Sequence, residues 1–384
     1  MRLVAASVYA LEIPLVETFR HSARARSFCD SVVVRVRDES GNEGFGEGVP
    51  RPYVTGETTA SMLEHVGRLW SLGSVKELPE LGAGGALQAI ESWLPASPLP
   101  GALADHASRA ALETAALDCL LRRHATPLGR LLPPARETVT YSGVITAGSP
   151  DTALQHARRM KLVGLGQVKL KVGFDDDIPR IHAVREALGP SVSLRLDANG
   201  AWTLERALEV LRATAGCDIA AAEQPLPRGP AEDLAKLRRA TSVPLMADES
   251  LVTLADAEAL IAAQAVDYFN VRVSKCGGLS RSLAIARSAS AAGIGIQVGS
   301  QVGETAILSA AGRHLAAHLP EVTFVEGSYG TLLLTEDVSA EGVRFGHRGV
   351  APVLTGPGLG IRVLEDRLRK YARTVVELHA GEAQ

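Results

Sequence analysis

Three acidic residues in the second half of the chain have the spacing of a metal site. Asp197 in LRLDANG, Glu223 in IAAAEQPL and Asp248 in VPLMADES each follow an apolar run. They recur at intervals of about 25 residues, the length of one strand, loop and helix. Equivalent points at the ends of successive parallel strands face one mouth of a barrel, so the spacing predicts that the carboxylates meet there. An oxygen-rich site of this kind suits a divalent cation.

Two lysines in the segment VKLKV could act on a substrate beside that cation. Lys169 and Lys171 are separated by a single leucine, so on a strand they share one face. Both faces of a barrel strand are covered, and a buried cation is costly unless it pairs, coordinates or reacts. The ammonium of Lys169, the metal and partial desolvation would all disfavour the charged form of Lys171. Lys171 is therefore the candidate base, with Lys169 beside it.

A third cation, Arg272 in NVRVSK, is expected on the strand that faces Lys171 across the barrel. Arginine stays protonated, so it is a poor base but a fixed charge that could hold a substrate carboxylate or stabilise an enolate. Strand alternation places Lys275 on the opposite face, pointing away from the site. A single base implies chemistry on one face of the substrate, whereas two-base racemisation requires a titratable group on each face.

This set of residues predicts the abstraction of a proton next to a carboxylate. A divalent metal that binds the substrate carboxylate acts as a Lewis acid and makes the hydrogen on the neighbouring carbon more acidic. Loss of that proton gives an enediolate whose charge faces the metal, and this electrostatic effect could supply several kcal/mol. Asn199 and Glu249 closely follow two of the metal ligands in the sequence. We expect them to orient the ligands or to hydrogen-bond Lys171.

The elements that must position these residues repeat along the chain. From TVTYSGVIT onward, apolar segments recur at about the same interval up to VTFVEGSYG, and they predict the eight strands of a barrel. We place this barrel at residues 131–350. Ser142 near the end of the first strand, Gly299 after the seventh and Glu326 at the eighth are candidate substrate contacts.

The first part of the chain follows another pattern. Residues 1–15 and 31–48 alternate like strands, and helical patterns follow them. Strands followed by helices are typical of a separate α+β unit. We predict an α+β capping domain at residues 1–130 and a C-terminal segment at residues 351–384 that returns to it.

Two polar segments of the first part, residues 17–28 and 49–58, are expected to be loops. Loops of this kind either cover the mouth of a barrel and select the substrate or are ordinary surface connections. If they cover the mouth, Arg20 and Tyr53 are candidate substrate contacts.

Composition narrows the class of protein. The 384 residues carry a net charge of −3 and 46% hydrophobic side chains, which suits a large core and gives no strong field for nucleic acid. The four cysteines are scattered without a CxxC pair, as in a reducing compartment. The sequence has neither a signal-peptide pattern nor an apolar run long enough for a membrane span. We therefore expect a cytoplasmic protein that binds neither membranes nor nucleic acid.

The motifs VKLKVG, RLDANGAW, AEQPL, MADES and NVRVSKCGG resemble those of the enolase superfamily, in particular its muconate-lactonizing-enzyme subgroup. The resemblance spans most of the chain and implies an α/β fold, a modified (β/α)7β TIM barrel with an N-terminal α+β capping domain. It also implies one Mg²⁺ or Mn²⁺ per active site, with Asp197, Glu223 and Asp248 as ligands and Lys171 as the base. The substrate would be a small carboxylate, and homo-oligomers are common in the family.

One position departs from the subgroup. The subgroup usually has a lysine where this sequence has Arg272, and Lys275 matches a second position that is generally not catalytic. The difference puts two-base racemisation in doubt but leaves the metal and the proton abstraction unchanged. The resemblance favours an isomerase, either a cycloisomerase or an epimerase of a small carboxylate, acylated amino acid or dipeptide. The alternatives are a lyase, such as a dehydratase or an o-succinylbenzoate-synthase-like enzyme, and a binding protein that has lost turnover.

Overall fold

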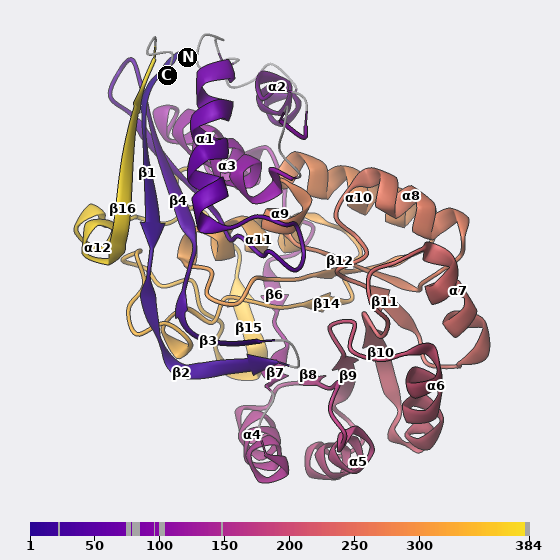
Figure 1. The fold of residues 1–384 in the computed structure, drawn as a ribbon. Helices are drawn as coiled ribbons and strands as arrows, with labels where there is room; N and C mark the ends of the chain where they lie inside the picture. Colours follow the sequence, from indigo (N-terminus) through magenta and orange to yellow (C-terminus); the bar gives the residue numbers. More distant parts are fainter. Residues whose placement is uncertain are drawn as a thin grey trace.

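The computed structural model describes residues 1–380 apart from residues 22–23, 74–77, 79–84, 96, 100–103 and 147–148. Within the described residues, an eight-stranded parallel sheet curls into a barrel, and a four-stranded antiparallel sheet with its helices lies beside it (Figure 1). The two chain ends lie close together on the smaller sheet.

The barrel strands follow the order of the sequence, each one parallel to its neighbours. The Ser142 amide donates to the Val325 carbonyl at 2.8 Å, which joins the first strand to the last. Most outward-facing strand residues are apolar because helices cover the outside of the sheet. The strands are β7 (Gly143–Ile145), β8 (Gln167–Lys171), β9 (Ser193–Asp197), β10 (Ile219–Glu223), β11 (Leu245–Ala247), β12 (Tyr268–Val271), β13 (Gly295–Val298) and β14 (Phe324–Val325).

Helices connect successive barrel strands and surround the sheet (Figure 1). Several begin at a hydroxyl cap; for example, the Thr152 amide donates to the Ser149 hydroxyl at 3.2 Å, which satisfies one of the free amides of a helix start. The helices and short 3₁₀ turns of this part are α4 (Pro150–Val163), α5 (Asp177–Leu188), α6 (Leu204–Ala213), η2 (Ala215–Cys217), α7 (Ala231–Ala240), α8 (Leu254–Ala262), α9 (Val273–Cys276), α10 (Leu279–Ala291), α11 (Ala306–His318), η3 (Gly330–Leu332) and η4 (His347–Gly349).

The register of the barrel brings the charged residues together. Lys171 is level with Asp197 across β8 and β9, and Asp197 is level with Glu223 across β9 and β10. Because level residues of neighbouring parallel strands point to the same face, these three side chains line up at the carboxyl ends of the strands. That end of a barrel is where active sites of this fold lie.

The smaller sheet has the strand order β16-β1-β4-β5. The last strand of the chain pairs antiparallel with the first, with Val8 opposite Val376. The limits of the three domains inferred from the sequence stay predictions. This part consists of β1 (Leu3–Leu11), β4 (Val32–Asp38), β5 (Glu43–Gly48), α1 (Thr59–Gly73), α2 (Ala86–Trp93), α3 (His106–Arg123), η1 (Leu128–Arg130), α12 (Glu365–Tyr371) and β16 (Ala372–His379).

Two sequence-based expectations about local structure were wrong. Residues 17–28, expected to be a loop, lie mostly in a hairpin of β2 (Ile13–His21) and β3 (Arg24–Cys29). The hairpin is stable because its backbone groups are paired: Phe19 is opposite Arg26, and the Val16 amide donates to the Leu333 carbonyl at 2.8 Å. The expected first barrel strand is also divided into β7 and a separate β6 (Thr138–Thr140), which pairs antiparallel with β15 (Val350–Pro352).

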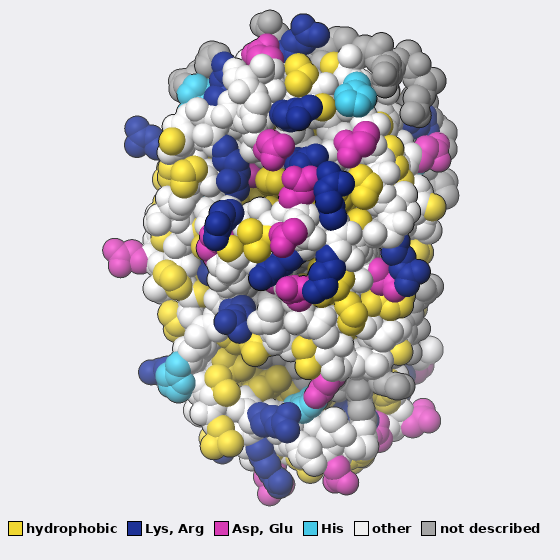
Figure 2. Space-filling model, turned by 90° about the vertical axis from the view of Figure 1, so that its left-hand side faces the viewer, with side chains coloured by type: hydrophobic (Ala, Val, Ile, Leu, Met, Phe, Trp, Pro, Cys, Tyr) yellow, Lys and Arg dark blue, Asp and Glu magenta, His cyan; other side chains and the backbone are white. Residues whose placement is uncertain are grey.

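The face around β16 and α12 is polar (Figure 2). Acidic and basic side chains alternate over it, and several are paired: Arg35 Nη1 lies 3.0 Å from Glu365 Oε1, and Lys370 Nζ lies 2.5 Å from Glu336 Oε2. Exposed ion pairs of this kind add little stability. Of the helices that the structure describes, none has the length and apolar character of a membrane span.

Candidate active site

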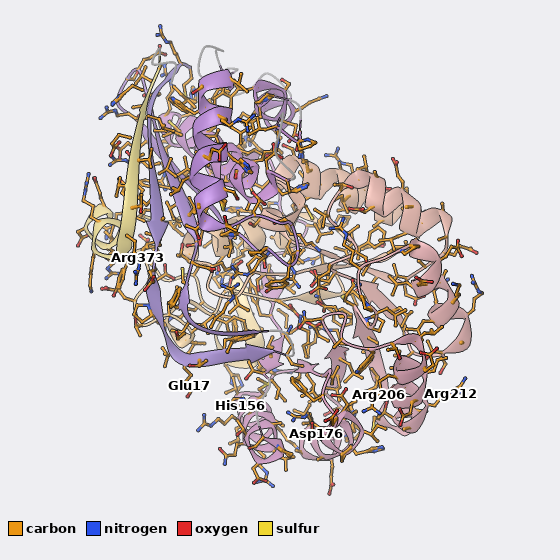
Figure 3. The ribbon with its side chains drawn as sticks, in the orientation of Figure 1. Glu17, His156, Asp176, Arg206, Arg212 and Arg373 are labelled. Carbon is orange, nitrogen blue, oxygen red and sulfur yellow. The ribbon has the colours of Figure 1, made fainter. Side chains whose placement is uncertain are left out.

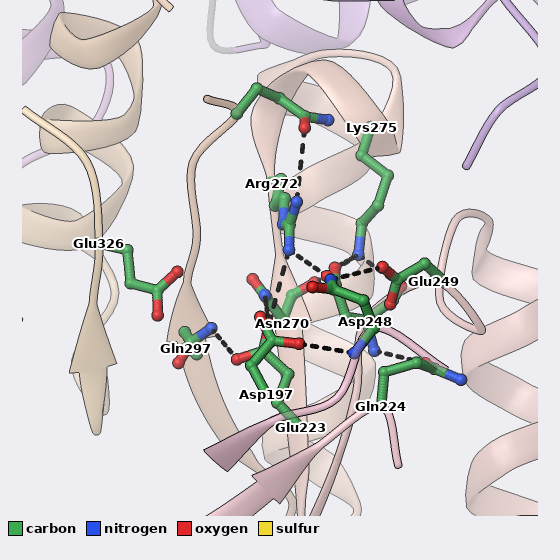
Figure 4. Close-up of polar contacts among 12 residues, drawn as sticks. Asp197, Glu223, Gln224, Asp248, Glu249, Asn270, Arg272, Lys275, Gln297 and Glu326 are labelled. Atoms are coloured by element: carbon green, nitrogen blue, oxygen red, sulfur yellow. Dashed lines mark hydrogen bonds and ion pairs between the residues drawn. The ribbon is translucent and has the colours of Figure 1, made fainter. Parts of the chain in front are cut away.

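The three carboxylates expected to hold a metal converge at the mouth of the barrel (Figure 4). Asp197 ends β9, Glu223 ends β10 and Asp248 directly follows β11. All three side chains are buried. Buried carboxylates require positive partners, and four cationic side chains supply them: two from β8, one from the residue that follows β12 and one from α9.

The two lysines of β8 have different surroundings. Lys169 Nζ lies 3.0 Å from Asp197 Oδ2, 3.2 Å from Glu223 Oε1 and 2.8 Å from Glu326 Oε2. Burial would lower the pKa of Lys169, but these carboxylates outweigh it and raise the pKa above its ordinary value. Lys171 Nζ lies 2.6 Å from Asp197 Oδ2 and 2.8 Å from Asn199 Oδ1. Lys169 is thus a fixed cation, and Lys171 is the lysine nearer the mouth, with fewer carboxylate partners.

Arg272 and Lys275 both contact Asp248. Arg272 Nη2 hydrogen-bonds Asp248 Oδ2 and lies 3.5 Å from Glu223 Oε1. Lys275 Nζ donates to Asp248 Oδ1 at 2.8 Å, to the Asp248 carbonyl at 2.7 Å and to the Asn270 carbonyl at 2.8 Å. The prediction that Lys275 points away was wrong because β12 ends at Val271 and the helical turn α9 follows. Residues three apart share a side of a helix.

The close packing of the acids separates their pKa values. Burial would raise the pKa of Asp197, but Lys171 and Lys169 outweigh it and hold the pKa below its usual range. Burial raises the pKa of Glu223 to about 7, and the nearby Asp197 contributes, although Lys169 acts against it. When several carboxylates share a site, one of them holds a proton more tightly. Of the three expected metal ligands, Glu223 is the one whose pKa is raised.

Amide side chains hold the carboxylates in place. Asn199 links Lys171 to Glu249, because its Nδ2 donates to Glu249 Oε1 at 3.0 Å. Asn270 Nδ2 donates to Glu223 Oε1 at 2.8 Å, and Gln297 Nε2 donates to Glu223 Oε2 at 3.0 Å. Sequence reasoning placed Asn199 and Glu249 near the ligands but missed Gln297, although a glutamine inside the apolar run GIGIQV was a signal.

Two further residues of the cluster were not found from the sequence. The Gln224 side-chain carbonyl accepts from the amides of Asp248 and Ser250, each at 3.0 Å, and so fixes the turn that carries Asp248. Arg195 Nη2 lies 3.0 Å from Glu326 Oε1, so Glu326 has one oxygen on Arg195 and the other on Lys169. The available signal for Arg195 was its place in LRLD, two residues before Asp197, which puts both side chains on the same face of the strand.

A cavity of about 330 Å³ opens above the cluster. Its floor includes Lys169, Lys171 and Arg272. Its roof comes from the hairpin and from the segment after β14, and it includes the apolar residues Val16, Phe19, Leu332 and Leu333. Glu17 on β2 and His156 on α4, both labelled in Figure 3, also line the cavity. Volume and lining suit a small molecule with one anionic end.

The candidate substrate contacts are not all at this cavity. Glu326 lines it. Gly299 lies beside it under Asn270, where a Cβ atom would come within 2.1 Å of Asn270 Oδ1. Ser142 and Tyr53 are not among the described residues of the lining: Ser142 lies at the amino end of β7, where its hydroxyl donates to Gln167 Oε1 at 3.1 Å, and Tyr53 is 38% exposed. The Arg20 side chain lies outside the described part of the chain.

The donor set fits a hard divalent cation such as Mg²⁺, since it consists of carboxylate and amide oxygens. Two buried oxygens beside the carboxylates, Glu249 Oε2 and Asn270 Oδ1, have no hydrogen-bond partner among the described residues. As the side chains stand, no three acidic, His or Cys residues within the described ranges are arranged to hold a metal ion. The guanidinium of Arg272 lies against Glu223 and Asp248, so a cation held by these carboxylates would compete with it for their oxygens.

Comparison with known proteins agrees with this geometry. Residues 152–367 match the family model described as "Enolase C-terminal domain-like". A hydrophobic dipeptide epimerase of Enterococcus faecalis is 31% identical, over 84% of this chain and 89% of that protein. A muconate cycloisomerase of Acinetobacter lwoffii is 30% identical, over 94% of this chain and 93% of that protein. The crystal structure of an N-succinyl Arg/Lys racemase from Bacillus cereus superposes with a TM-score of 0.91 at 28% identity, covering 99% and 100% of the two chains.

The chain therefore belongs to the enolase superfamily, in the subgroup that includes the muconate cycloisomerases and dipeptide epimerases. The family, the barrel with its separate N-terminal cap and the isomerase class of enzyme, all predicted from the sequence, are confirmed. Identities near 30% leave the substrate of this chain to be argued from its own site.

Proposed function

We propose that this enzyme removes a proton from the carbon next to a substrate carboxylate, with Lys171 as the base. Three features support the proposal. Lys171 lines the cavity, its Nζ lies 2.6 Å from Asp197 Oδ2, and its neighbour Lys169 is enclosed by three carboxylates and kept charged. A lysine locked as an ammonium cannot accept a proton, which leaves Lys171 for this role.

We assign one Mg²⁺ or Mn²⁺ to Asp197, Glu223 and Asp248. When bound, this cation supplies a Lewis acid that polarises the substrate carboxylate and makes its α-proton more acidic. Asn270 and Gln297 orient Glu223, and Asn199 holds the amine of Lys171. The buried surroundings keep these groups fixed before the substrate arrives.

Arg272 acts as a fixed cation on the side of the cavity across from Lys171. Burial would lower its pKa, but Asp248 and Glu223 outweigh burial and raise it, so Arg272 does not act as a base. Lys275 is no substitute, since its ammonium already donates to three oxygens. The strands thus offer one base, which favours ring closure or proton return on one face. The same feature supports a lyase as the second candidate, in which a group leaves from the same face.

The substrate we propose is a small carboxylate, such as an acylated amino acid or a dipeptide. The 330 Å³ cavity supports a compact molecule, and beyond the cluster its lining combines apolar residues with Glu17, His156 and Arg159. Both oxygens of Glu326 are bound by Lys169 and Arg195, so this acid is not available to a substrate ammonium. We also expect a cytoplasmic protein, since the four cysteines are free thiols buried in the fold, and a homo-oligomer, because homo-oligomers are common in the family.

A screen in D₂O tests the proposal. The protein with Mg²⁺ is incubated with pools of N-acylamino acids, dipeptides, hydroxy acids and muconates, and mass spectra are recorded. We expect deuterium uptake or an isomeric product in one pool, and its loss when EDTA removes the cation. Loss of water or of another small fragment would select the lyase instead. The absence of exchange in every pool, from folded protein that binds Mg²⁺, would contradict the proposal.

A further inference from the structure

One wall of the cavity is built by residues 299–305, which follow β13 and which we call the strand-seven loop. Five of its residues line the cavity: Ser300, Gln301, Val302, Gly303 and Glu304. Part of this loop also contacts the buried cluster, because Arg272 Nη1 donates to Gln301 Oε1 at 3.4 Å. Its position therefore affects both the shape of the cavity and the placement of Arg272.

The strand-seven loop is held by a carboxylate from the other domain. Glu47 on β5 accepts from the Thr305 amide at 2.8 Å, from the Thr305 hydroxyl at 2.7 Å and from the Leu308 amide at 2.9 Å. These amides are at the start of α11 and have no partner within the helix. A carboxylate at this end of a helix is favoured both by hydrogen bonding and by the helix dipole. Glu47 is fully buried, so water does not replace these bonds.

The sequence of β5 explains why Glu47 reaches the barrel. Gly44, Gly46 and Gly48 alternate along GFGEG on the face that lies against α3. A Cβ atom on Gly46 would come within 1.9 Å of the Ala111 carbonyl oxygen, so only glycine allows this approach. Glu47 lies on the opposite face of the strand. Because β5 packs closely against α3 on one face, Glu47 on the other face points toward α11.

A second side chain of the capping domain holds the middle of the loop. Arg51 is buried, and its Nη2 donates to the Val302 carbonyl at 2.5 Å, while its Nη1 donates to Asp30 Oδ1 at 2.8 Å. Gly303 is pressed against the same domain, since a Cβ atom there would lie 3.1 Å from Cys29 Cα. The loop is thus fixed at its middle by Arg51 and at its end by Glu47.

We propose that Glu47 and Arg51 are positioning residues for the reaction: they hold the strand-seven loop so that Gln301 places Arg272 and the cavity keeps its shape. The inference rests on the proposed function only in its effect on turnover, because the holding of the loop can be measured without substrate. Neither residue lines the cavity among the described residues. Both act through the loop, and displacement of a site by about 1 Å can lower turnover roughly 100-fold.

The test compares Glu47→Gln with Glu57→Gln. Glu57 is a matched control, because it caps the start of α3 inside the capping domain, accepting from Ala107 at 2.9 Å and from Ser108 at 3.2 Å. Each variant replaces a buried, helix-capping carboxylate by an amide. Hydrogen–deuterium exchange of the backbone should increase at residues 299–308 in Glu47→Gln and at the start of α3 in Glu57→Gln. With the substrate found by the screen, kcat/KM should fall by about 10- to 100-fold for Glu47→Gln and less than about 3-fold for Glu57→Gln.

Arg51→Met provides a second variant if Glu47→Gln does not fold. It should increase exchange at Val302 and its neighbours and lower kcat/KM in the same range. Unchanged exchange at residues 299–308 in both variants would overturn the inference whether or not a substrate is known. Equal losses of turnover in Glu47→Gln and Glu57→Gln would show that Glu47 affects turnover through the overall stability of the protein and not through the loop. If exchange increases at residues 299–308 but no pool contains a substrate, the inference about the loop stands and the proposed function is contradicted.

Discussion

The Nζ atom of Lys171 and the Oδ2 atom of Asp197 lie 2.6 Å apart, from level positions on neighbouring strands. The same carboxylate is a ligand in the proposed metal site and the closest charged partner of the proposed base. Asp197 Oδ2 also lies 3.0 Å from Lys169 Nζ. The charge of Asp197 therefore acts on the proposed metal, on the fixed cation Lys169 and on the proposed base Lys171.

Mg²⁺ should stabilise the folded protein through Glu223. Burial raises the pKa of this carboxyl to about 7, and a divalent ion held by the carboxylate would favour its charged form. At a Mg²⁺ concentration about 100 times the Kd, binding should add about 2.7 kcal/mol to the free energy of unfolding. Thermal unfolding with and without Mg²⁺ measures the effect, and Glu223→Gln should remove most of it. An equal Mg²⁺ response in the variant would show that the ion binds elsewhere.

Arg272→Lys should change the stereochemistry of exchange. A lysine there can lose a proton, which Arg272 cannot, so a second base would become available on the opposite side of the cavity. We expect some deuterium exchange with inversion in the variant, whereas the natural enzyme exchanges on one face. Chiral chromatography of the recovered substrate measures this. Unchanged stereochemistry in Arg272→Lys, or inversion by the natural enzyme, would contradict the one-base assignment.

Glu113 should make stability depend on pH. Burial raises its pKa to about 8, and Glu91 adds to the increase, while Ser280 and Arg281 act against it. Because the folded state holds this proton more tightly than the unfolded chain, the stability it contributes is complete below about pH 4.5 and is lost as pH rises through about 8. Glu113→Gln stays neutral and keeps an acceptor for the Ser280 amide, which Glu113 Oε1 accepts at 3.0 Å.

The measurement for Glu113 is urea unfolding at several pH values. The free energy of unfolding of the natural protein should fall more steeply between about pH 5 and 8 than that of Glu113→Gln. Parallel curves for the two proteins would contradict the assignment of this proton to Glu113.

Gly46→Ala should strongly destabilise the capping domain. The added Cβ would come within 1.9 Å of the Ala111 carbonyl oxygen and 2.5 Å of the Ala115 amide nitrogen, both backbone atoms of α3. Overpacking of this kind costs about 1–3 kcal/mol or more. Gly216→Ala is the control, because no atom lies within 4 Å of its added Cβ. Urea unfolding should separate the two variants, and similar midpoints would mean that β5 can move away from α3 at little cost.

The repeat of the acids was enough to predict the barrel and the meeting of three carboxylates. In a parallel barrel the position of a residue along its strand fixes its height, so a regular interval in sequence becomes a ring of neighbours in space. Lys171 and Asp197 are level for this reason. Side-chain parity also placed Lys169 and Lys171 on the same inner face.

Features that depend on breaks in regular structure could not be predicted. Lys275 faces the site because β12 ends four residues before it and a helical turn follows, which parity along a strand does not anticipate. Ser142 lies below the cavity because the first strand is divided at that point. The hairpin at residues 17–28 depends on pairing with Leu333, a partner far away in the sequence.

The central claim is that Lys171 takes the α-proton, and exchange catalysed by Lys171→Ala tests it most directly. The substrate found by the screen is incubated in D₂O with Mg²⁺ and either the natural enzyme or the variant. We predict that the exchange rate falls by about 100- to 10,000-fold, while the thermal unfolding temperature still rises with Mg²⁺. Exchange by Lys171→Ala at a rate close to that of the natural enzyme would contradict the account.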